Sequence, residues 1–315
     1  MTSDELTARV ARLLGQRHPV FAAATVTGSG VTLASQGADT DADFELGSIS
    51  KGFTGLLYAQ AVARGEVKPE STLGALLPLG AVPAAAVTLR SLSIHRSGLP
   101  RLPRSMHPYR RTWEFVRRGS NPYGDDLAGL LEQTRAERVG APKPRYSNFG
   151  FQLLGHAMAA AANTTYAELV DARIATPLGL SSVYVPRNEA ELRPTAVVGR
   201  SPRGKPRQPW TGEALGPAGG IRASIRDMAQ LIAALLDCSA PGLAALDPVE
   251  KLVGVTRIGA AWITLPVRGR QITWHNGGTG GFQSWLGLDR AAGTGAVILS
   301  ATAISVDRAG FKLLE

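Results

Sequence analysis

The sequence predicts an α/β (α+β) fold, because helical and strand patterns occupy different parts of the chain. Helical periodicity marks residues 2–17, the segment that begins at Ser48 and two later apolar stretches. A succession of short β-type runs fills residues 260–300. With 315 residues and 44% hydrophobic content, the chain is long enough to bury one large core or two intimate ones.

Each predicted helix has a recognisable start. Residues 2–17 open with a capping-box pattern and continue with an apolar stripe along one face. From Ser48 onward, apolar residues recur at near-helical spacing, and a similar run follows Phe149. Residues 222–236 contain a second capping pattern near their start, with Ser224 followed three residues later by Asp227.

Four runs of β-branched, aromatic and aliphatic residues predict strands near the C-terminus (260–265, 271–274, 282–288 and 295–300). The glycine-rich segment 275–281 lies between the second and third run. Glycines let a backbone approach a ligand closely or take positive φ. The segment is therefore either a ligand-holding element or an ordinary hairpin loop with His275 exposed in a turn.

Ser48 and Lys51 form the first candidate catalytic pair. Three residues correspond to about one helical turn, so the two side chains are expected on the same face. A serine hydroxyl needs a neighbouring base, and burial of an ammonium favours its neutral, basic form. The alternative is a solvated lysine on a surface helix, since an SxxK spacing alone is a weak motif.

Tyr146 and Asn148 lie in a loop that precedes an apolar, helical run. Tyr146 is a candidate proton carrier between Ser48 and a leaving group, and Asn148 a candidate hydrogen-bond partner for a substrate carbonyl or amide. The alternative is a core tyrosine followed by Asn148 as a helix cap. Backbone N–H groups of Ser48 and of about Gly278 are candidates for an oxyanion hole.

Three motifs together resemble those of the penicillin-recognising serine enzymes, in the branch of the class C β-lactamases, D,D-peptidases and related esterases. They are Phe44-Glu-Leu-Gly-Ser48-Ile-Ser-Lys51, Tyr146-Ser-Asn148 and His275-Asn-Gly277. Further similarities to landmarks of this family lie at residues 87–100, 217–224 and 280–282. The resemblance runs from about residue 20 to the end of the chain.

The resemblance implies a β-lactamase/transpeptidase-like fold, with an antiparallel sheet flanked by helices and a mostly helical insert. It implies a single unit over 1–315, with one α/β lobe from about 1–60 and 211–315 and a helical lobe over about 61–210. Ser48 would be the nucleophile, Lys51 its base or proton partner, and Tyr146 a proton carrier. Asn148, His275 and Gly277 would contact substrate.

His275 departs from the β-lactamase pattern, in which lysine is usual at this position, whereas histidine occurs in peptidases and esterases of the family. A neutral imidazole holds an anionic carboxylate less firmly than an ammonium does. The departure makes β-lactam hydrolysis a weaker expectation than acyl chemistry in general. For His95 the resemblance implies a structural place.

The charge is strongly basic, at a net +9 with a pI near 10.1. Two basic stretches, 101–118 and 200–209, either form solvated faces or steer an anionic substrate toward a cleft. Arg110 and Arg111 in the first stretch are the positions at which steering would be tested. Arginine, tyrosine and tryptophan interleave along the first stretch, as they do in some nucleic-acid sites. Nucleic acid is nevertheless not the expected partner.

No metal or other cofactor is expected, since no Cys/His pair has ligand spacing. The start of the sequence has no signal-peptide pattern and no segment reads as a membrane span, so a cytoplasmic protein without a membrane partner is expected. The first functional interpretation is a hydrolase of small esters or amides. The alternatives are a transacylase that passes acyl-Ser48 to an amine or alcohol, and a non-catalytic ligand-binding protein.

Overall fold

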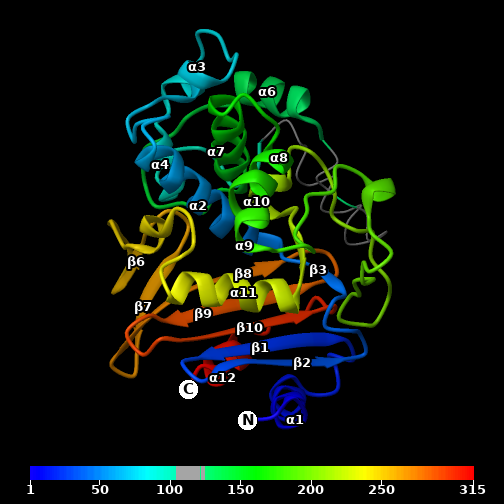
Figure 1. Ribbon diagram of the computed structural model, residues 1–315. Coiled ribbons are helices and arrows are strands. Elements are labelled where there is room, and N and C mark those ends of the chain that lie inside the picture. The colour runs from blue at the N-terminus through cyan, green and yellow to red at the C-terminus, as the bar shows by residue number, and fades with distance from the viewer. Residues whose placement is uncertain (104–120, 122–124) are drawn as a thin grey trace.

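The computed structural model describes residues 1–103, 121 and 125–315 (Figure 1). An antiparallel sheet of eight strands forms its base, with the strand order β2-β1-β10-β9-β8-β7-β6-β5. The strands are β1 (Phe21–Thr27), β2 (Gly30–Gln36), β5 (Glu250–Val253), β6 (Thr256–Ile258), β7 (Ile263–Val267), β8 (Arg270–Gly278), β9 (Gln283–Asp289) and β10 (Thr294–Ser300). A separate two-stranded ribbon pairs β3 (Asp43–Glu45) with β4 (Arg222–Ser224). The expected β-lactamase/transpeptidase-like arrangement, an antiparallel sheet flanked by helices, is confirmed.

Helices cover both faces of the sheet. Five helices of the described residues have ten or more residues: α1 (Ser3–Leu14), α2 (Ser50–Ala63), α6 (Leu127–Ala136), α7 (Asn148–Ala161) and α11 (Ile225–Leu236). The shorter ones are α3 (Leu73–Leu76), α4 (Leu89–Ser93), α8 (Tyr166–Val170), α9 (Thr176–Leu178), α10 (Gly216–Gly219) and α12 (Asp307–Leu313). No helix in the described part of the chain combines the length and hydropathy needed to cross a bilayer.

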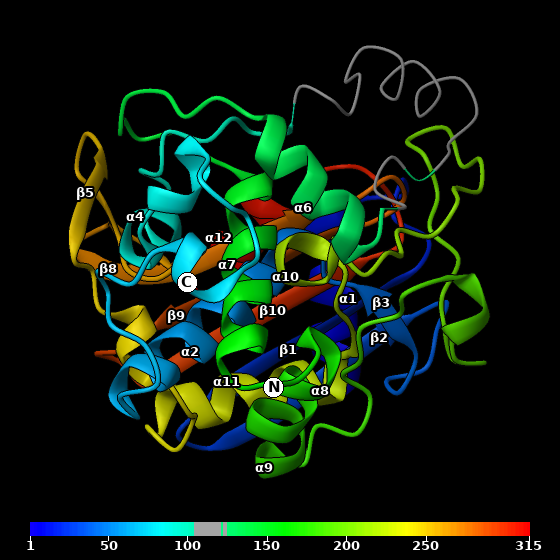
Figure 2. The same cartoon turned by 90° about the horizontal axis from the view of Figure 1, so that it is seen from above.

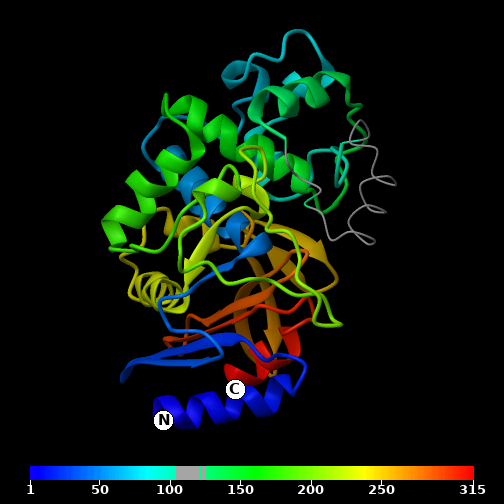
Figure 3. The same cartoon turned by 90° about the vertical axis from the view of Figure 1, so that its right-hand side faces the viewer.

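Alternation along β1 divides the core between the two faces of the sheet. Phe21 and Ala23 point to the face covered by α1 and α12, whereas Ala22 and Ala24 join the larger core under the remaining helices. Figure 3 shows the two terminal helices below the sheet and the other helices above it. From above, α2, α7 and α11 lie over the strands (Figure 2).

The predicted helices are present, with altered starts. Thr2 caps α1 through a complete capping box, as expected, and Ser224 caps α11 by accepting the Asp227 N–H. The expected helix over 222–236 begins only at Ile225, because the three preceding residues pair with β3 as a strand. Ser48 lies in a 3₁₀ turn, Gly47–Ile49, and α2 follows from Ser50.

The predicted strands near the C-terminus are also present, but the glycine-rich segment is not a long hairpin loop. His275 lies inside β8, and the strand continues to Gly278 by pairing with Gln283 of β9. His275 is buried, so the alternative of an exposed turn residue is wrong. The division into lobes at about residues 60 and 210 stays a prediction.

Buried ion pairs join β3, the strand just before Ser48, to β4. Arg222 of β4 is 1% exposed and forms ion pairs with Asp43 and Glu45 of β3, which are equally buried. Glu45 also accepts the backbone N–H of Trp210 at 2.9 Å. Removal of one partner from a buried ion pair leaves an uncompensated charge, so this cluster fixes where β3 delivers the chain to Ser48.

Candidate active site

Ser48 and Lys51 meet as their spacing predicts. Lys51 Nζ lies 3.0 Å from Ser48 Oγ and donates to the Ala218 carbonyl oxygen at 2.5 Å. Lys51 is fully buried, whereas Ser48 keeps partial exposure. The alternative of a solvated surface lysine is wrong.

The turn that carries Ser48 depends on close backbone contact with β8. Gly47 has φ +53°, and a Cβ there would lie 2.6 Å from the Gly278 nitrogen. A Cβ on Gly277 would lie 2.0 Å from the Leu46 carbonyl oxygen and 2.9 Å from the Ser48 nitrogen. Glycine is required at both positions because β8 packs directly on the nucleophile turn.

Burial lowers the pKa of Lys51 well below its ordinary value, and the nearby charge of Arg101 lowers it further. The ammonium form is disfavoured because few groups compensate it. Nζ donates to one carbonyl and lies 4.9 Å from the centre of the Tyr146 ring. A neutral amine in this position can accept the Ser48 hydroxyl proton while it still donates to Ala218.

Tyr146 and Asn148 flank the start of α7. Ser147, rather than Asn148, caps this helix: its hydroxyl accepts the Gly150 N–H at 2.8 Å and donates to the Pro100 carbonyl at 2.6 Å. The alternative role of Asn148 as the cap is therefore wrong. Tyr146 and Asn148 are both only half-buried, so the alternative of a buried core tyrosine is wrong as well.

His95 holds the loop that carries Tyr146. Its Nδ1 accepts the Ser147 N–H at 3.2 Å, and its carbonyl oxygen accepts the Arg145 N–H at 2.8 Å. The imidazole also lies against the Tyr146 ring, with 4.5 Å between centroids. His95 is buried and has φ +57°, which few residues other than glycine and asparagine adopt. The structural place expected for His95 is thus a support for the Tyr146 loop.

Replacement of His95 by Asn and by Gly separates the Nδ1 hydrogen bond from the backbone requirement. Both residues tolerate positive φ, but only the asparagine oxygen can replace Nδ1 as acceptor. We expect His95→Gly to have about fivefold lower kcat than His95→Asn, since one buried hydrogen bond is worth about 1 kcal/mol. The measurement is ester turnover by both variants at saturating substrate, with unfolding midpoints as control. Equal kcat values would show that Nδ1 does not position Tyr146.

His275 presents an unprotonated nitrogen to the buried side of the site. Its Nδ1 lies 2.6 Å from the Asn276 carbonyl oxygen, which only accepts, so Nδ1 carries the proton and Nε2 is a lone-pair acceptor. Burial lowers the pKa of His275 to about 4, and Lys51 contributes to the shift. The imidazole is therefore neutral at pH 7. Among the described residues, Nε2 has no hydrogen-bond partner.

The register of β8 and β9 leaves the Gly278 N–H available. Thr279 donates to the Phe282 carbonyl at 3.0 Å, and antiparallel neighbours alternate between bonded and non-bonded pairs. Gly278, opposite Gln283, is therefore a non-bonded pair whose N–H points away from β9. The Ser48 turn packs against this glycine, since a Cβ on Gly47 would lie 2.6 Å from the Gly278 nitrogen.

Arg101, the first residue of the basic stretch 101–118, lies beside Tyr146, a place that the sequence did not assign to it individually. Its guanidinium lies 5.7 Å from the centre of the Tyr146 ring, and its carbonyl oxygen accepts the N–H groups of Asn148 and Phe149. The rest of the basic stretch 101–118, from residue 104 on and including Arg110 and Arg111, lies outside the described residues. The second stretch adjoins the β8–β9 turn, where the backbone N–H of Arg200 donates to the Gly281 carbonyl oxygen at 3.1 Å.

Comparison with known proteins places this geometry in context. The family model described as Beta-lactamase matches residues 6–312. Beta-lactamase-like protein 2 of Dictyostelium discoideum is 32% identical over 167 residues, which cover 46% of this chain and 27% of that protein. The D-alanyl-D-alanine-carboxypeptidase/endopeptidase AmpH of Escherichia coli (strain K12) is 27% identical over 151 residues, which cover 46% of this chain and 38% of that protein. The chain thus matches well under two thirds of either relative.

Solved structures match over nearly the whole chain. The D-alanine carboxypeptidase AmpC from Burkholderia cenocepacia superposes with a TM-score of 0.83 at 22% identity, with 99% of each chain covered. The class C beta lactamase from Rhodobacter sphaeroides gives a TM-score of 0.78 at 21% identity, with 95% of this chain and 94% of that chain covered. At these identities the likeness concerns the fold.

Proposed function

The chain belongs to the beta-lactamase family of serine hydrolases, and we propose that it acts on a small ester or amide through an acyl-enzyme on Ser48. The contact between Ser48 Oγ and the buried Lys51 Nζ, at 3.0 Å, carries this proposal. A non-catalytic binding protein has no need to bury a lysine against a serine hydroxyl. Burial of an amine is costly, and here it yields a base.

In the proposed acylation, Ser48 Oγ bonds to the substrate carbonyl carbon while its proton passes to Lys51 Nζ. Negative charge develops on the carbonyl oxygen, beside the backbone N–H groups of Ser48 and Gly278. The bond to the leaving group then breaks, and the leaving oxygen or nitrogen takes a proton by way of Tyr146. Asn148, Gly277 and His275 lie around the substrate on the loop and strand that border Ser48.

In the proposed deacylation, water bonds to the acyl carbon, the acid departs and the proton returns to Ser48 Oγ. An amine or alcohol that replaces water would release an amide or ester instead, which makes a transacylase the second candidate. The two candidates share every residue up to the acyl-enzyme. They differ only in whether the site admits an acceptor better than water.

The substrate has an anionic group in this proposal, because Arg101 adds a positive charge next to Tyr146. His275 does not supply that charge, since its imidazole is neutral and presents a lone pair. At this position of β8, a hydrogen-bond acceptor, His275 Nε2, therefore stands in place of the lysine that is usual in the β-lactamase pattern. The position suits a substrate with an N–H or O–H group there better than one with a carboxylate.

Trapping of the acyl-enzyme tests both the proposal and the alternative. The protein is incubated with a fluorophosphonate and with activated esters that carry either an anionic or a neutral acyl group, and its intact mass is recorded. A β-lactam and a peptide that ends in D-alanyl-D-alanine belong in the panel, because the relatives' names point to them. One stoichiometric adduct located on Ser48 is the expected result.

Addition of amines or alcohols to the trapped species then separates the two reactions. For a hydrolase, the adduct disappears at a rate independent of acceptor concentration and releases only acid. For a transacylase, the rate rises with acceptor concentration and the coupled product accumulates. A panel that leaves the mass unchanged, together with tight binding of an unreacted ligand, would contradict the proposal and favour the binding protein.

A further inference from the structure

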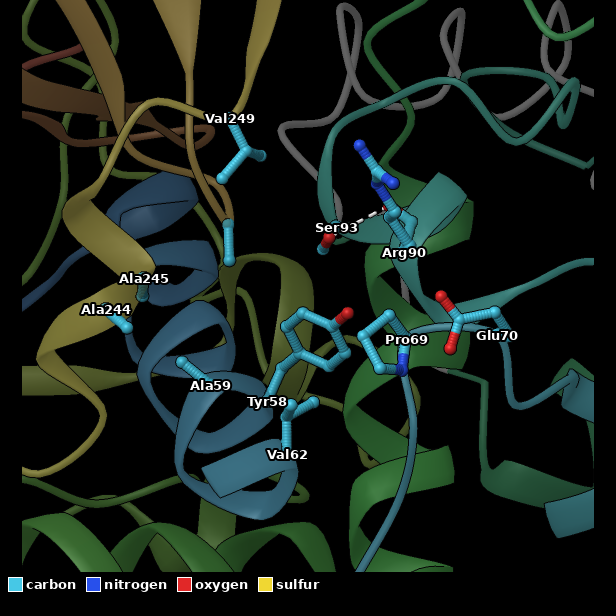
Figure 4. A pocket seen from close by; sticks show the side chains of 11 residues that line it. Tyr58, Ala59, Val62, Pro69, Glu70, Arg90, Ser93, Ala244, Ala245 and Val249 are labelled. Carbon is cyan, nitrogen blue, oxygen red and sulfur yellow. Dashed lines mark hydrogen bonds between the residues drawn. The ribbon is translucent and has the colours of Figure 1, made fainter. Parts of the chain in front are cut away.

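A second hollow lies on α2, away from every residue assigned to the acyl-enzyme site. It has a volume of about 320 Å³, at the small end of the range for ligand pockets, and eleven residues line it (Figure 4). Tyr58 and Val62 of α2 form part of its wall, and Ala244, Ala245 and Val249 form another part. Ser48, Lys51, Tyr146 and His275 are not among its lining residues.

One side of this hollow is apolar. Ala59, Ala244, Ala245 and Val249 lie together there, as Figure 4 shows. Ala245 is buried, whereas Val249 is 54% exposed. An apolar group that enters the hollow would remove this surface from water, which is the main source of affinity in small pockets.

The serine hydroxyl at the hollow already has a partner, since Ser93 donates to the Arg90 carbonyl oxygen at 2.9 Å. This hydroxyl therefore makes no strong demand on a ligand for a hydrogen bond. The stronger demand comes from two exposed charged side chains, Arg90 and Glu70.

Arg90 and Glu70 lie on the same side of the hollow, next to Tyr58 (Figure 4). Within the described part of the chain, neither side chain has a hydrogen bond or a salt bridge to an opposite charge. Both side chains act on the same phenol. Burial is the largest cause of the raised pKa of Tyr58; Glu70 raises this pKa further and Arg90 lowers it. Two opposite, unpaired charges thus flank one small apolar space.

We propose that this hollow binds a small zwitterion with an apolar side group, such as a free α-amino acid of leucine or phenylalanine type. Arg90 would hold the carboxylate in a two-pronged hydrogen bond, and Glu70 would accept from the ammonium. The apolar group would lie against the alanine and valine wall. A purely apolar ligand would leave both charges unused, and a simple carboxylate would face repulsion from Glu70.

Calorimetric titration of the Ser48→Ala protein tests the proposal without interference from turnover. The ligands are the two enantiomers of leucine, N-acetylleucine, which lacks the ammonium, and leucinamide, which lacks the carboxylate. We expect leucine to bind with at least about tenfold lower Kd than either derivative, in line with the loss of one charge-assisted contact. Equal binding of all three compounds, or binding of none, would overturn the proposal.

Variants then locate the binding. Arg90→Gln and Glu70→Gln should each weaken leucine binding at least about tenfold, and Arg90→Gln should no longer distinguish leucine from leucinamide. Ala244→Leu fills the hollow from one wall and Ala59→Leu from α2, so binding should be lost in both. Ala160→Leu, an exposed alanine at the far end of α7, is the matched control and should bind as the parent does. Unchanged binding in both filled variants would place the ligand elsewhere and refute the site.

The outcome is separable from that of the proposed function. Failure of leucine to bind leaves the acyl-enzyme experiment untouched, because the titrated protein lacks the nucleophile. Failure of acylation likewise leaves the titration valid, because the lining residues of the hollow do not include Ser48 or Lys51.

Discussion

Ser48→Ala is expected to lower turnover of activated esters by at least about ten-thousandfold and to abolish the fluorophosphonate adduct. The Ser48 hydroxyl lies 3.0 Å from Lys51 Nζ, and alanine has no atom that can form the acyl bond. Because Ser48 is partly exposed and the change to alanine removes only the hydroxyl oxygen, the fold should survive the change.

Ser50→Ala is the matched control for this result. Ser50 lies two residues away, is fully buried and accepts the Ile221 N–H at 3.1 Å. Its replacement should reduce stability by about 1 kcal/mol and leave the mass adduct in place. Substantial turnover in the Ser48 variant, or loss of the adduct in the Ser50 variant alone, would refute Ser48 as nucleophile.

Lys51→Met should lower kcat/KM at least about a hundredfold, given the usual contribution of a general base. Methionine keeps the length and the apolar stem but cannot take the Ser48 proton. Lys51→Arg is the informative companion, since a guanidinium keeps the charge and remains protonated at any accessible pH. Both variants should fail if Lys51 is the base, whereas a purely electrostatic role would let arginine retain much of the activity. Steady-state kinetics on a neutral ester distinguishes the two outcomes.

The pH dependence of stability gives an independent check on the charge of Lys51. Its pKa in the folded chain lies well below the value of about 10.4 expected for the unfolded chain. Between these two values the unfolded state binds more protons, so the free energy of unfolding rises with pH, by up to about 1.4 kcal/mol per unit. Lys51→Met removes this dependence. Urea titrations at pH 7 and 9.5 should therefore show the parent gaining stability relative to the variant at the higher pH, and a constant difference would contradict the neutral lysine.

Sequence reasoning located the local contacts of the site. The Ser48–Lys51 pair follows from one turn of helical spacing, and the capping box of α1 follows from its residue pattern. Both depend on neighbours within a few residues, for which the chain itself fixes the geometry.

Long-range contacts account for what the sequence left open. The pairing of Tyr146 with His95, the approach of Arg101 and the acceptance of the Lys51 hydrogen bond by Ala218 join segments far apart in the chain. The choice of Ser147 over Asn148 as the cap was also open, since both residue types favour that position. No local pattern distinguishes these contacts, because tertiary packing decides them.

The separation of the site segments along the chain has a consequence for biosynthesis. The Ser48 turn can pack against Gly277 and Gly278 only after β8 has been synthesised. Strand β1 can likewise complete its pairing only after β10 has been synthesised, since Phe21 pairs with Ser300. At roughly 5–20 residues per second, a ribosome needs about 10–50 s to pass from one site segment to the other. During that interval the nascent chain carries the proposed nucleophile without the Gly278 N–H that the proposed oxyanion hole requires. Catalytic competence would therefore arise only after the last strands leave the ribosome, so that an unfinished chain cannot acylate itself on cellular esters.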